Sequence, residues 1–431
     1  MRILVYARYY QLRSFLRNLT GLPGTVMHFI TDFPESDIPG LRDGFYRHYQ
    51  RGPSRNAEME VDEDDIRNRC RLLRNLPEDQ AKRMLRAMYD TIDGFLNPDA
   101  YDCVITPMVD NYITDLFARI AMTRGLRHIG LAVSYFPGYT LVTSYGEANP
   151  RRNVQEREIQ VLLDLLLDDT FRRDYQPMRE YSFRIHVQKV MRQIIRRTLF
   201  TVWRFTRRDP LHYHWVVPRF DAIHKSFTNY PSSSYFDKDW EERVCVTGRP
   251  VVYVPLAFTP ESTTDYWVRD LRMIHYETAI LKACEVLAQR YCVVVKEHPH
   301  ILGIREKAFY KQLRRIPNVI LVPPEVKSNY VLRFASHVLV GGGSVGVEAT
   351  LRRKRVYTYC DRSYWFATSG ARYLDPGKME LWPEVLMTPP RGIEDPGAFL
   401  EECLRSHIPF DFFNVSTSLP GRRDDLLAFL R

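Results

Sequence analysis

One stretch decides the fold class of this 431-residue chain: Val338-Leu339-Val340-Gly341-Gly342-Gly343-Ser344-Val345-Gly346-Val347-Glu348-Ala349. It predicts an apolar strand that runs into three glycines and then into a helix. Glycines let a ligand approach the backbone closely, and the first amides of a helix offer unpaired N–H groups beside the positive end of its dipole. The order of strand, glycine loop and helix therefore predicts a parallel α/β unit whose loop can bind phosphate.

The residues of this loop have distinct candidate roles. Gly342, Gly343 and Val345 would offer backbone to a phosphate, Ser344 its hydroxyl, and Glu348 would accept from ribose hydroxyls. The stretch is neither a P-loop, which needs Gly-Lys-Ser/Thr, nor the dinucleotide fingerprint, which follows the first strand of a unit. The alternative is a plain glycine turn with Ser344 as helix N-cap, although Glu348 lies one residue too late for a capping box.

A second motif, Val295-Lys296-Glu297-His298-Pro299-His300, ends another apolar strand. Pro299 stops the strand, so Lys296 and His298 are expected at the carboxyl edge of the sheet, where both can meet phosphate. The alternative is an edge turn whose histidine satisfies a backbone group. Zinc is less favoured, because His298 and His300 have no acidic or cysteine partner at ligand spacing.

A third polar segment, Thr259-Pro260-Glu261-Ser262-Thr263-Thr264, follows the strand predicted over 251–256. Glu261 and Thr263 would face a ligand at the same edge. Alternatively, Ser262–Thr264 merely begins the next helix.

Strands and helices alternate in both halves of the chain, which predicts parallel sheets with helices on both faces. Residues 34 to about 56 read as a loop, and 150–245 break the alternation. We therefore expect an α/β protein with two Rossmann-like domains that face each other across a cleft. The expected parts are an N-terminal domain over 1–150, a helical basic insertion and linker over 151–245, a second domain over 246–390, and a closing segment over 391–431 that packs back across the domains.

Composition excludes disordered and fibrous classes, since 45% of residues are hydrophobic and 26% charged. No run approaches the ~20 apolar residues of a membrane-spanning helix, and the first residues enter a strand at once, so a cytoplasmic location is expected. The seven cysteines are scattered, which indicates reduced thiols. A net charge of +9 favours an anionic partner.

Three motifs together resemble bacterial capsule and surface-polysaccharide glycosyltransferases of the GT-B fold. They are Val-Pro-Leu-x-x-x-Pro-Glu-Ser-Thr-Thr from Val254, Lys-Glu-His-Pro from Lys296, and Gly-Ser-Val-Gly-Val-Glu-Ala from Gly343. Related His-Pro and Ser motifs occur in Kdo-transferases and polysialyltransferases, which use CMP-activated sugars. The resemblance implies that His298 and Ser344 contact the donor phosphate and Glu348 the nucleoside. Many relatives carry a second hydroxyl where this chain has Gly342-Gly343-Ser344, which leaves the donor open.

The same resemblance places the acceptor and a catalytic base in the first half, where the looser matches are Val109-Asp110-Asn111-Tyr112 and Gly146-Glu147. Asp110 follows the strand expected over 101–106 and is the first candidate for a base in an inverting transfer. It would otherwise be the N-cap of the next helix. Glu147 is the second candidate, and a retaining mechanism would need neither.

The segment 183–208 predicts a long basic helix with eight Lys or Arg residues and no Asp or Glu. Its apolar residues recur at three- and four-residue steps, a pattern typical of helices that lie on an anionic membrane. The alternative is a core helix neutralised by the acidic helix over 156–169. Nucleic acid is not expected as a partner, because no recognition signature is present.

These observations predict a metal-independent glycosyltransferase that uses a nucleotide sugar, CMP-Kdo being favoured, and no other cofactor. The acceptor would be an oligosaccharide or lipid-linked glycan. The alternatives are an enzyme like UDP-sugar 2-epimerases, which share the two-domain fold, and an inactive GT-B scaffold in capsule assembly.

Overall fold

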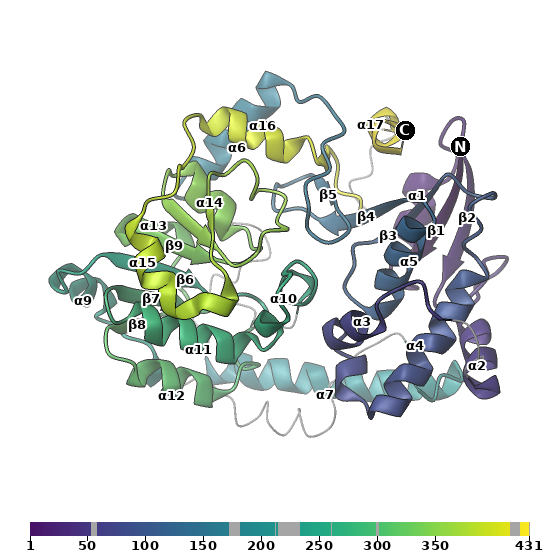
Figure 1. Cartoon of the computed structure of the whole chain (residues 1–431), viewed down its shortest axis with the longest axis horizontal. Coiled ribbons are helices and arrows are strands. Elements are labelled where there is room, and N and C mark those ends of the chain that lie inside the picture. Colours follow the sequence, from purple (N-terminus) through teal and green to yellow (C-terminus); the bar gives the residue numbers. More distant parts are fainter. Residues whose placement is uncertain are drawn as a thin grey trace. The chain divides into compact units, whose positions relative to one another are not determined.

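The computed structural model describes residues 1–52, 58–171, 182–211, 213, 233–259, 261–298, 301–413 and 423–430. Contacts divide the chain into two compact units (Figure 1). Unit 1 comprises Met1–Val154, Trp203–Val216 and Cys403–Arg431, and unit 2 comprises Gln155–Val202 and Val217–Glu402. Each unit holds one six-stranded sheet.

Unit 1 is built on the sheet β12-β5-β4-β3-β1-β2. Strands β1 (Arg2–Ala7), β2 (Val26–Thr31), β3 (Cys103–Pro107) and β4 (Arg127–Val133) pair in parallel, because helices connect them. Two short strands, β5 (Thr140–Val142) and β12 (His407–Ile408), add antiparallel pairs at one edge.

Six helices of unit 1 lie in the described residues: α1 (Leu12–Leu19), α2 (Leu41–Arg51), α3 (Glu63–Arg69), α4 (Glu78–Asp93), α5 (Tyr112–Thr123) and α17 (Arg423–Leu430), with a 3-10 turn at Leu73–Asn75. The prediction of a loop from residue 34 to about 56 is wrong over Leu41–Arg51, which form the helix α2. Leu41 and Phe45, four residues apart, are both fully buried. Gly44 permits close packing on α4, since a Cβ there would lie 2.7 Å from Thr91 Cγ2.

Unit 2 is built on the wholly parallel sheet β11-β10-β9-β6-β7-β8. Its strands are β6 (Val251–Pro255), β7 (Cys292–Lys296), β8 (Val319–Val322), β9 (His337–Val340), β10 (Arg355–Thr358) and β11 (Arg372–Tyr373). The first five are short, largely apolar runs with most residues buried, as parallel sheets require, whereas the edge strand β11 is partly exposed.

The helices of unit 2 include α6 (Glu156–Leu167), α9 (Trp240–Val246), α10 (Ser262–Asp265), α11 (Tyr276–Leu287), α12 (Lys307–Arg315), α13 (Ser328–Phe334), α14 (Val345–Leu351) and α15 (Trp382–Met387). Two helices run from unit 2 into residues of unit 1: α7 (Phe183–Thr206) and α16 (Pro396–Leu404). The 3-10 turns are Ser233–Tyr235, Leu271–Ile274 and Pro376–Leu381.

The predicted α/β class with two Rossmann-like sheets is confirmed, whereas a cleft between the units stays a prediction. The contacts divide the chain elsewhere than at the predicted boundaries. Within 151–245, α6 belongs to unit 2, where Nη1 of Arg352, the C-cap residue of α14, donates to the Leu166 carbonyl at 3.1 Å. The closing segment joins unit 1 from Cys403 onward, because β12 pairs with β5. No helix among the described residues combines the length and apolarity needed to cross a membrane.

Candidate functional site

The order of strands in unit 2 fixes where a ligand site belongs. The chain passes from β6 to β7 and β8 on one side, and then returns to β9 and β10 on the other side. The loops that leave β6 and β9 therefore diverge at their carboxyl ends, the position where open parallel sheets bind ligands. The loop after β9 is the glycine loop, and the loop after β6 carries Glu261 and Thr263.

The three glycines of the loop differ in what surrounds them. A Cβ at Gly341 would lie 2.7 Å from the Tyr359 hydroxyl, and one at Gly342 would lie 2.8 Å from Trp267 Cε3. These two glycines are thus explained by close packing. Gly343 is exposed, has nothing within 4 Å of a Cβ position and does not adopt a positive φ. Neither packing nor conformation requires a glycine there, which leaves room for a ligand.

Ser344 does not act as a side-chain cap. Its backbone is already helical, with φ −61° and ψ −24°, and its hydroxyl makes no capping hydrogen bond. An N-cap serine would have extended backbone and would accept from an amide in the first turn. The side chain is half-buried beside exposed Gly343. The arrangement fits a hydroxyl that donates to a ligand better than it fits a cap.

Helix α14, which follows the loop, packs tightly against the side chain of Trp365. A Cβ at Gly346 would lie 2.2 Å from Trp365 Cζ2, so the fully buried indole packs directly on the first helical turn. Val345 and Glu348 on the same short helix are half-buried. The loop and the start of α14 therefore keep a fixed geometry around Ser344.

Lys296, the last residue of β7, is a buried cation. The residue is only 5% exposed, and its Nζ donates to the Glu297 carbonyl at 3.2 Å. Burial lowers the pKa of Lys296 to about 8, although the charges of Glu297, Glu348 and Glu325 act in the opposite direction. The influence of Glu348 means that β7 and α14 bring these two candidates to one region of unit 2. An ammonium group with three donors in such a place is suited to an anionic ligand.

His298 lies two residues beyond, half-buried, with its ring edge-on to Phe258 at 5.4 Å between centroids. Its backbone N–H donates to Glu297 Oε1 at 2.6 Å. Phe258 comes from the loop after β6, so the loops after β6 and β7 meet here. Pro299 and His300, and also Pro260, lie outside the described residues.

A buried network that the sequence did not predict fixes these two loops. Arg305, whose side chain is fully buried, donates from Nε to Glu297 Oε2 at 2.7 Å and from Nη2 to the Ala257 carbonyl at 3.0 Å. Tyr310 donates to the same Oε2 at 2.8 Å. Ala257 and Glu297 follow β6 and β7, so Arg305 joins both loops and positions His298. Glu297 lies within the Lys-Glu-His-Pro motif, but Arg305, eight residues later, belongs to no motif of the sequence and no regular spacing links the two.

Glu261 and Thr263 are engaged with their own turn. Thr263 Oγ1 donates to Glu261 Oε2 at 2.8 Å, and the Glu261 backbone N–H donates to Thr264 Oγ1 at 3.3 Å. Glu261 is the N-cap of α10 and takes part in a capping box. The alternative interpretation, that this segment begins a helix, accounts for the observed contacts, and donor contacts from these residues stay a prediction.

In unit 1 the chain adds β2 on one side of β1 and then β3 on the other side, so the strand order changes direction between β1 and β3. Asp110 follows the carboxyl end of β3 at this point. The Asp110 carboxylate forms an ion pair with Arg8, which follows β1. Arg71 Nη2 donates to the Asp110 carbonyl at 3.1 Å. The N-cap of α5 is Asn111, whose Oδ1 accepts from two first-turn amides. Capping therefore does not account for the Asp110 side chain.

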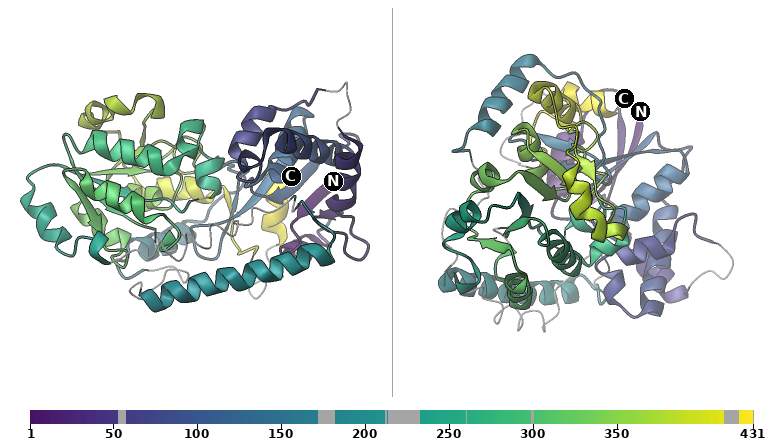
Figure 2. Two further views of the ribbon diagram at one scale, coloured as in Figure 1. Left: turned by 90° about the horizontal axis from the view of Figure 1, so that it is seen from below. Right: turned by 60° about the vertical axis from the view of Figure 1, so that its left-hand side comes forward.

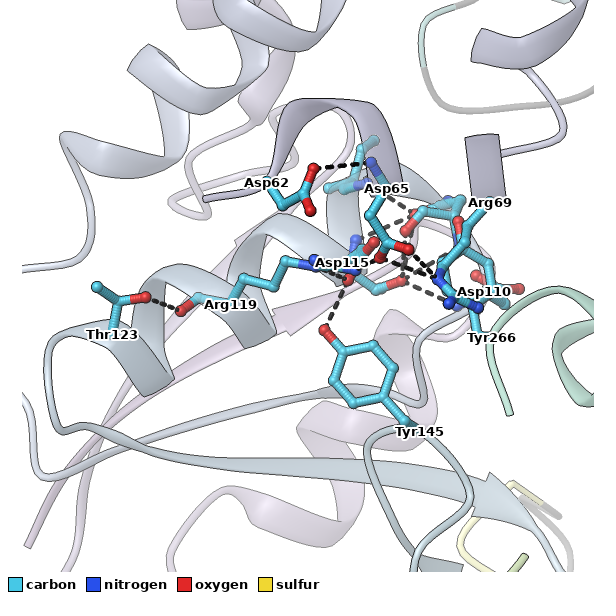
Figure 3. Close-up of polar contacts among 12 residues, drawn as sticks. Asp62, Asp65, Arg69, Asp110, Asp115, Arg119, Thr123, Tyr145 and Tyr266 are labelled. Carbon is cyan, nitrogen blue, oxygen red and sulfur yellow. Dashed lines mark hydrogen bonds and ion pairs between the residues drawn. The ribbon is translucent and has the colours of Figure 1, made fainter. Parts of the chain in front are cut away.

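Near Asp110, a buried network joins α3, α5 and the loop after β5 (Figure 3). Asp115 is fully buried and accepts from Arg119 Nε at 2.8 Å and from the Tyr145 hydroxyl at 2.6 Å. Burial raises the pKa of Asp115 in spite of Arg119. Burial also acts to raise the pKa of Asp65, but hydrogen bonds from Arg69 and Arg119 outweigh it, and the pKa is lowered. This network stabilises the edge on which Asp110 lies.

Glu147 clamps its own turn. Its two carboxylate oxygens accept from the backbone N–H groups of Ser144 and Tyr145, at 2.8 and 2.7 Å. Both oxygens hold the loop, so of the two candidate bases Asp110 is better placed. Within the parts of the chain that the structure describes, no three His, Cys, Asp or Glu side chains are grouped so as to hold a metal ion.

No known family model matches the chain, and no curated protein matches its sequence. Similar solved structures include UDP-GlcNAc 2-epimerase from Methanocaldococcus jannaschii, at TM-score 0.28 and 14% identity, over 94% of this chain and 99% of that one. The β-Kdo 2,4 transferase KpsC of Thermosulfurimonas dismutans matches at TM-score 0.31 and 12% identity, over 72% and 80%. The α,α-trehalose 6-phosphate synthase of Burkholderia multivorans matches at TM-score 0.33 and 13% identity, over 100% and 98%. Every one of these TM-scores is below 0.5, so these likenesses carry no argument about function.

Proposed function

We propose that the chain is a glycosyltransferase of the GT-B type, in which unit 2 binds a nucleotide-activated sugar. The observation that carries the proposal is the loop after β9 in unit 2, at the point where the strand order changes direction. Neither packing nor backbone conformation requires a glycine at exposed position 343, and the Ser344 hydroxyl makes no capping hydrogen bond. Such a loop lets a phosphate approach backbone amides, with a hydroxyl beside it.

Charge around the loop supports an anionic donor. Lys296 is buried at the end of β7, and the phosphate of a bound donor would place a negative charge beside its ammonium group. His298 would donate to the same phosphate, and Glu348 would accept from ribose hydroxyls. Glu261 and Thr263 would contribute from the loop after β6 after exchanging their present local hydrogen bonds for ligand contacts.

The acceptor would bind to unit 1, with Asp110 as the base that takes the proton of the attacking hydroxyl in an inverting transfer. Arg8 would hold the carboxylate in place through their ion pair. We propose a CMP-activated acidic sugar as donor and a growing or lipid-linked surface polysaccharide as acceptor, on the basis of the motif resemblance. The enzyme would work in the cytoplasm, without a metal ion.

The direct test is a thermal-shift screen of the purified chain against CMP, CDP, UDP, GDP and their sugar conjugates. A ligand that binds only the native state stabilises it by about 2.7 kcal/mol at a hundredfold excess over its Kd. A response to CMP or CMP-Kdo alone is expected. A response confined to UDP or GDP would keep the site and overturn the donor, and no response to any nucleotide would overturn the enzyme proposal in favour of a scaffold.

Asp110→Asn then separates the two halves of the mechanism. This variant should bind the nucleotide sugar with unchanged affinity and should lose transfer to acceptor. Glu147→Gln should lower stability and should not abolish transfer, because its carboxylate holds a turn. Conversion of UDP-GlcNAc to its 2-epimer without acceptor would instead favour the epimerase alternative.

A further inference from the structure

The outer face of α7 is an exposed apolar stripe. Met191, Ile195, Leu199 and Val202 recur at steps of four, four and three residues, so they lie on one face of the helix. They are 45%, 55%, 64% and 57% exposed. Phe205, one further step along, is 81% exposed. A row of five large apolar side chains in water is unusual for a soluble surface and marks a binding face.

The opposite face of the helix accounts for its attachment. His186 and Val190 are buried, and Lys189 Nζ donates to the Leu302 carbonyl at 3.4 Å within unit 2. The apolar stripe is therefore additional to the residues that pack α7 on the fold. Figure 2 shows α7 as one long, regular helix, drawn in teal.

Charge along the helix favours a negative partner. Arg184, Arg192 and Arg196 are exposed. Arg192 and Arg196 directly follow Met191 and Ile195 and therefore line one edge of the stripe, while Arg184 lies in line with the stripe toward the start of the helix. No Asp or Glu occurs between residues 183 and 208. A helix with an apolar face and cationic flanks buries its apolar side chains at the headgroup boundary of a bilayer, while its arginines meet anionic lipid.

We propose that this face of α7 docks on an anionic lipid bilayer. The proposal does not depend on the sugar-transfer chemistry. A second copy of the chain is the competing occupant, since α6 also exposes apolar residues, Val161 at 58% and Leu165 at 36%, beside acidic ones. A contact of α7 with α6 of another copy would be heterologous and would propagate instead of closing, unless its rotation formed a ring. A bilayer would cover the apolar stripe of α7 without requiring a second protein surface, and the positive charge of the helix favours an anionic bilayer as the occupant.

The test is flotation of the full chain with phosphatidylcholine vesicles made with and without phosphatidylglycerol. The wild-type chain should float with the anionic vesicles and should be released by added salt, because exposed charge interactions are screened. Equal binding to both kinds of vesicle, or to neither, would overturn the proposal. So would concentration-dependent self-association by sedimentation velocity in a chain that does not bind vesicles.

Variants locate the docking face. Ile195→Gln with Leu199→Gln should abolish flotation. Arg192→Gln with Arg196→Gln should weaken it by about 30-fold, taking about 1 kcal/mol for each arginine near an anionic surface. The matched control is Val161→Gln with Leu165→Gln, which removes exposed apolar residues from the acidic helix α6 and should leave flotation unchanged. Equal losses in the control and the α7 variants would overturn the assignment. All of these positions are exposed, and circular dichroism with the midpoint of thermal unfolding serves as the check that each variant is folded.

Discussion

The buried ammonium of Lys296 gives the sharpest prediction, because a group kept for ligand binding should cost stability in the free protein. Burial lowers the pKa of Lys296 from the ordinary 10.5 to about 8. That difference corresponds to about 3 kcal/mol of folding free energy lost whenever the lysine is charged in both states. We predict that Lys296→Met, which keeps the aliphatic stem, raises the free energy of unfolding at pH 7 by up to about 3 kcal/mol.

The pH dependence fixes the sign. Below about pH 8 the lysine is protonated in both the folded and the unfolded chain, so the full cost is present. Between about 8 and 10.5 the folded chain loses the proton first, and the cost declines; above 10.5 it is absent. Wild type should therefore gain stability relative to Lys296→Met as the pH rises through this range. Urea unfolding at pH 7 and pH 10 measures the difference between the two proteins, in which other titrating groups cancel.

Lys282→Met is the matched control, since Lys282 is exposed on α11. Its difference from wild type should be small and should not change with pH. The same Lys296→Met variant should show weaker nucleotide binding. The reasoning would be refuted if Lys296→Met were less stable than wild type at pH 7 and if the difference in unfolding free energy were the same at pH 10.

Two further predictions concern unit 1 and the glycine loop. Burial lowers the pKa of His128 and of His407 to about 3, so the unfolded chain takes up two more protons than the folded chain between pH 6.5 and 3. Stability should fall by about 2.7 kcal/mol per pH unit below 6.5 in urea unfolding, and by about half of that in His407→Asn. Gly346→Ala should cost on the order of 1–3 kcal/mol, because its Cβ would meet Trp365, whereas Gly343→Ala should stay within about 0.5 kcal/mol in the same assay. A flat pH profile, or equal costs at the two glycines, would contradict these expectations.

Local patterns were sufficient to predict much of the sheet structure. The strand expected before Gly341, the strand expected to end near Lys296 and the strand predicted over 251–256 are present as β9, β7 and β6. Each is a short apolar run bounded by turn residues, and its signal lies within the run itself. The strand, glycine loop and helix order also placed the loop at the carboxyl edge correctly.

Features that depend on contacts between distant residues could not be predicted in this way. Strand β12 pairs with β5 across more than half of the chain, and each has only two or three residues to signal it. Both carboxylate oxygens of Glu147 accept from backbone N–H groups of its own turn, a contact that no spacing in the sequence signals. Capping of α5 falls on Asn111 instead of Asp110, a shift of one residue that composition cannot resolve. The roles of the candidate site residues remain predictions.

In the proposed enzyme, the loop Gly341–Ser344 holds the phosphate of a nucleotide sugar. Isothermal titration of the nucleotide that responds in the thermal-shift screen, into wild type, Gly343→Ala and Ser344→Ala, tests it most directly. Neither substitution disturbs a contact of the fold, so melting temperatures should be unchanged while both affinities fall by at least about tenfold, or about 1.4 kcal/mol. Wild-type affinity in both variants would contradict the claim and would place the nucleotide elsewhere.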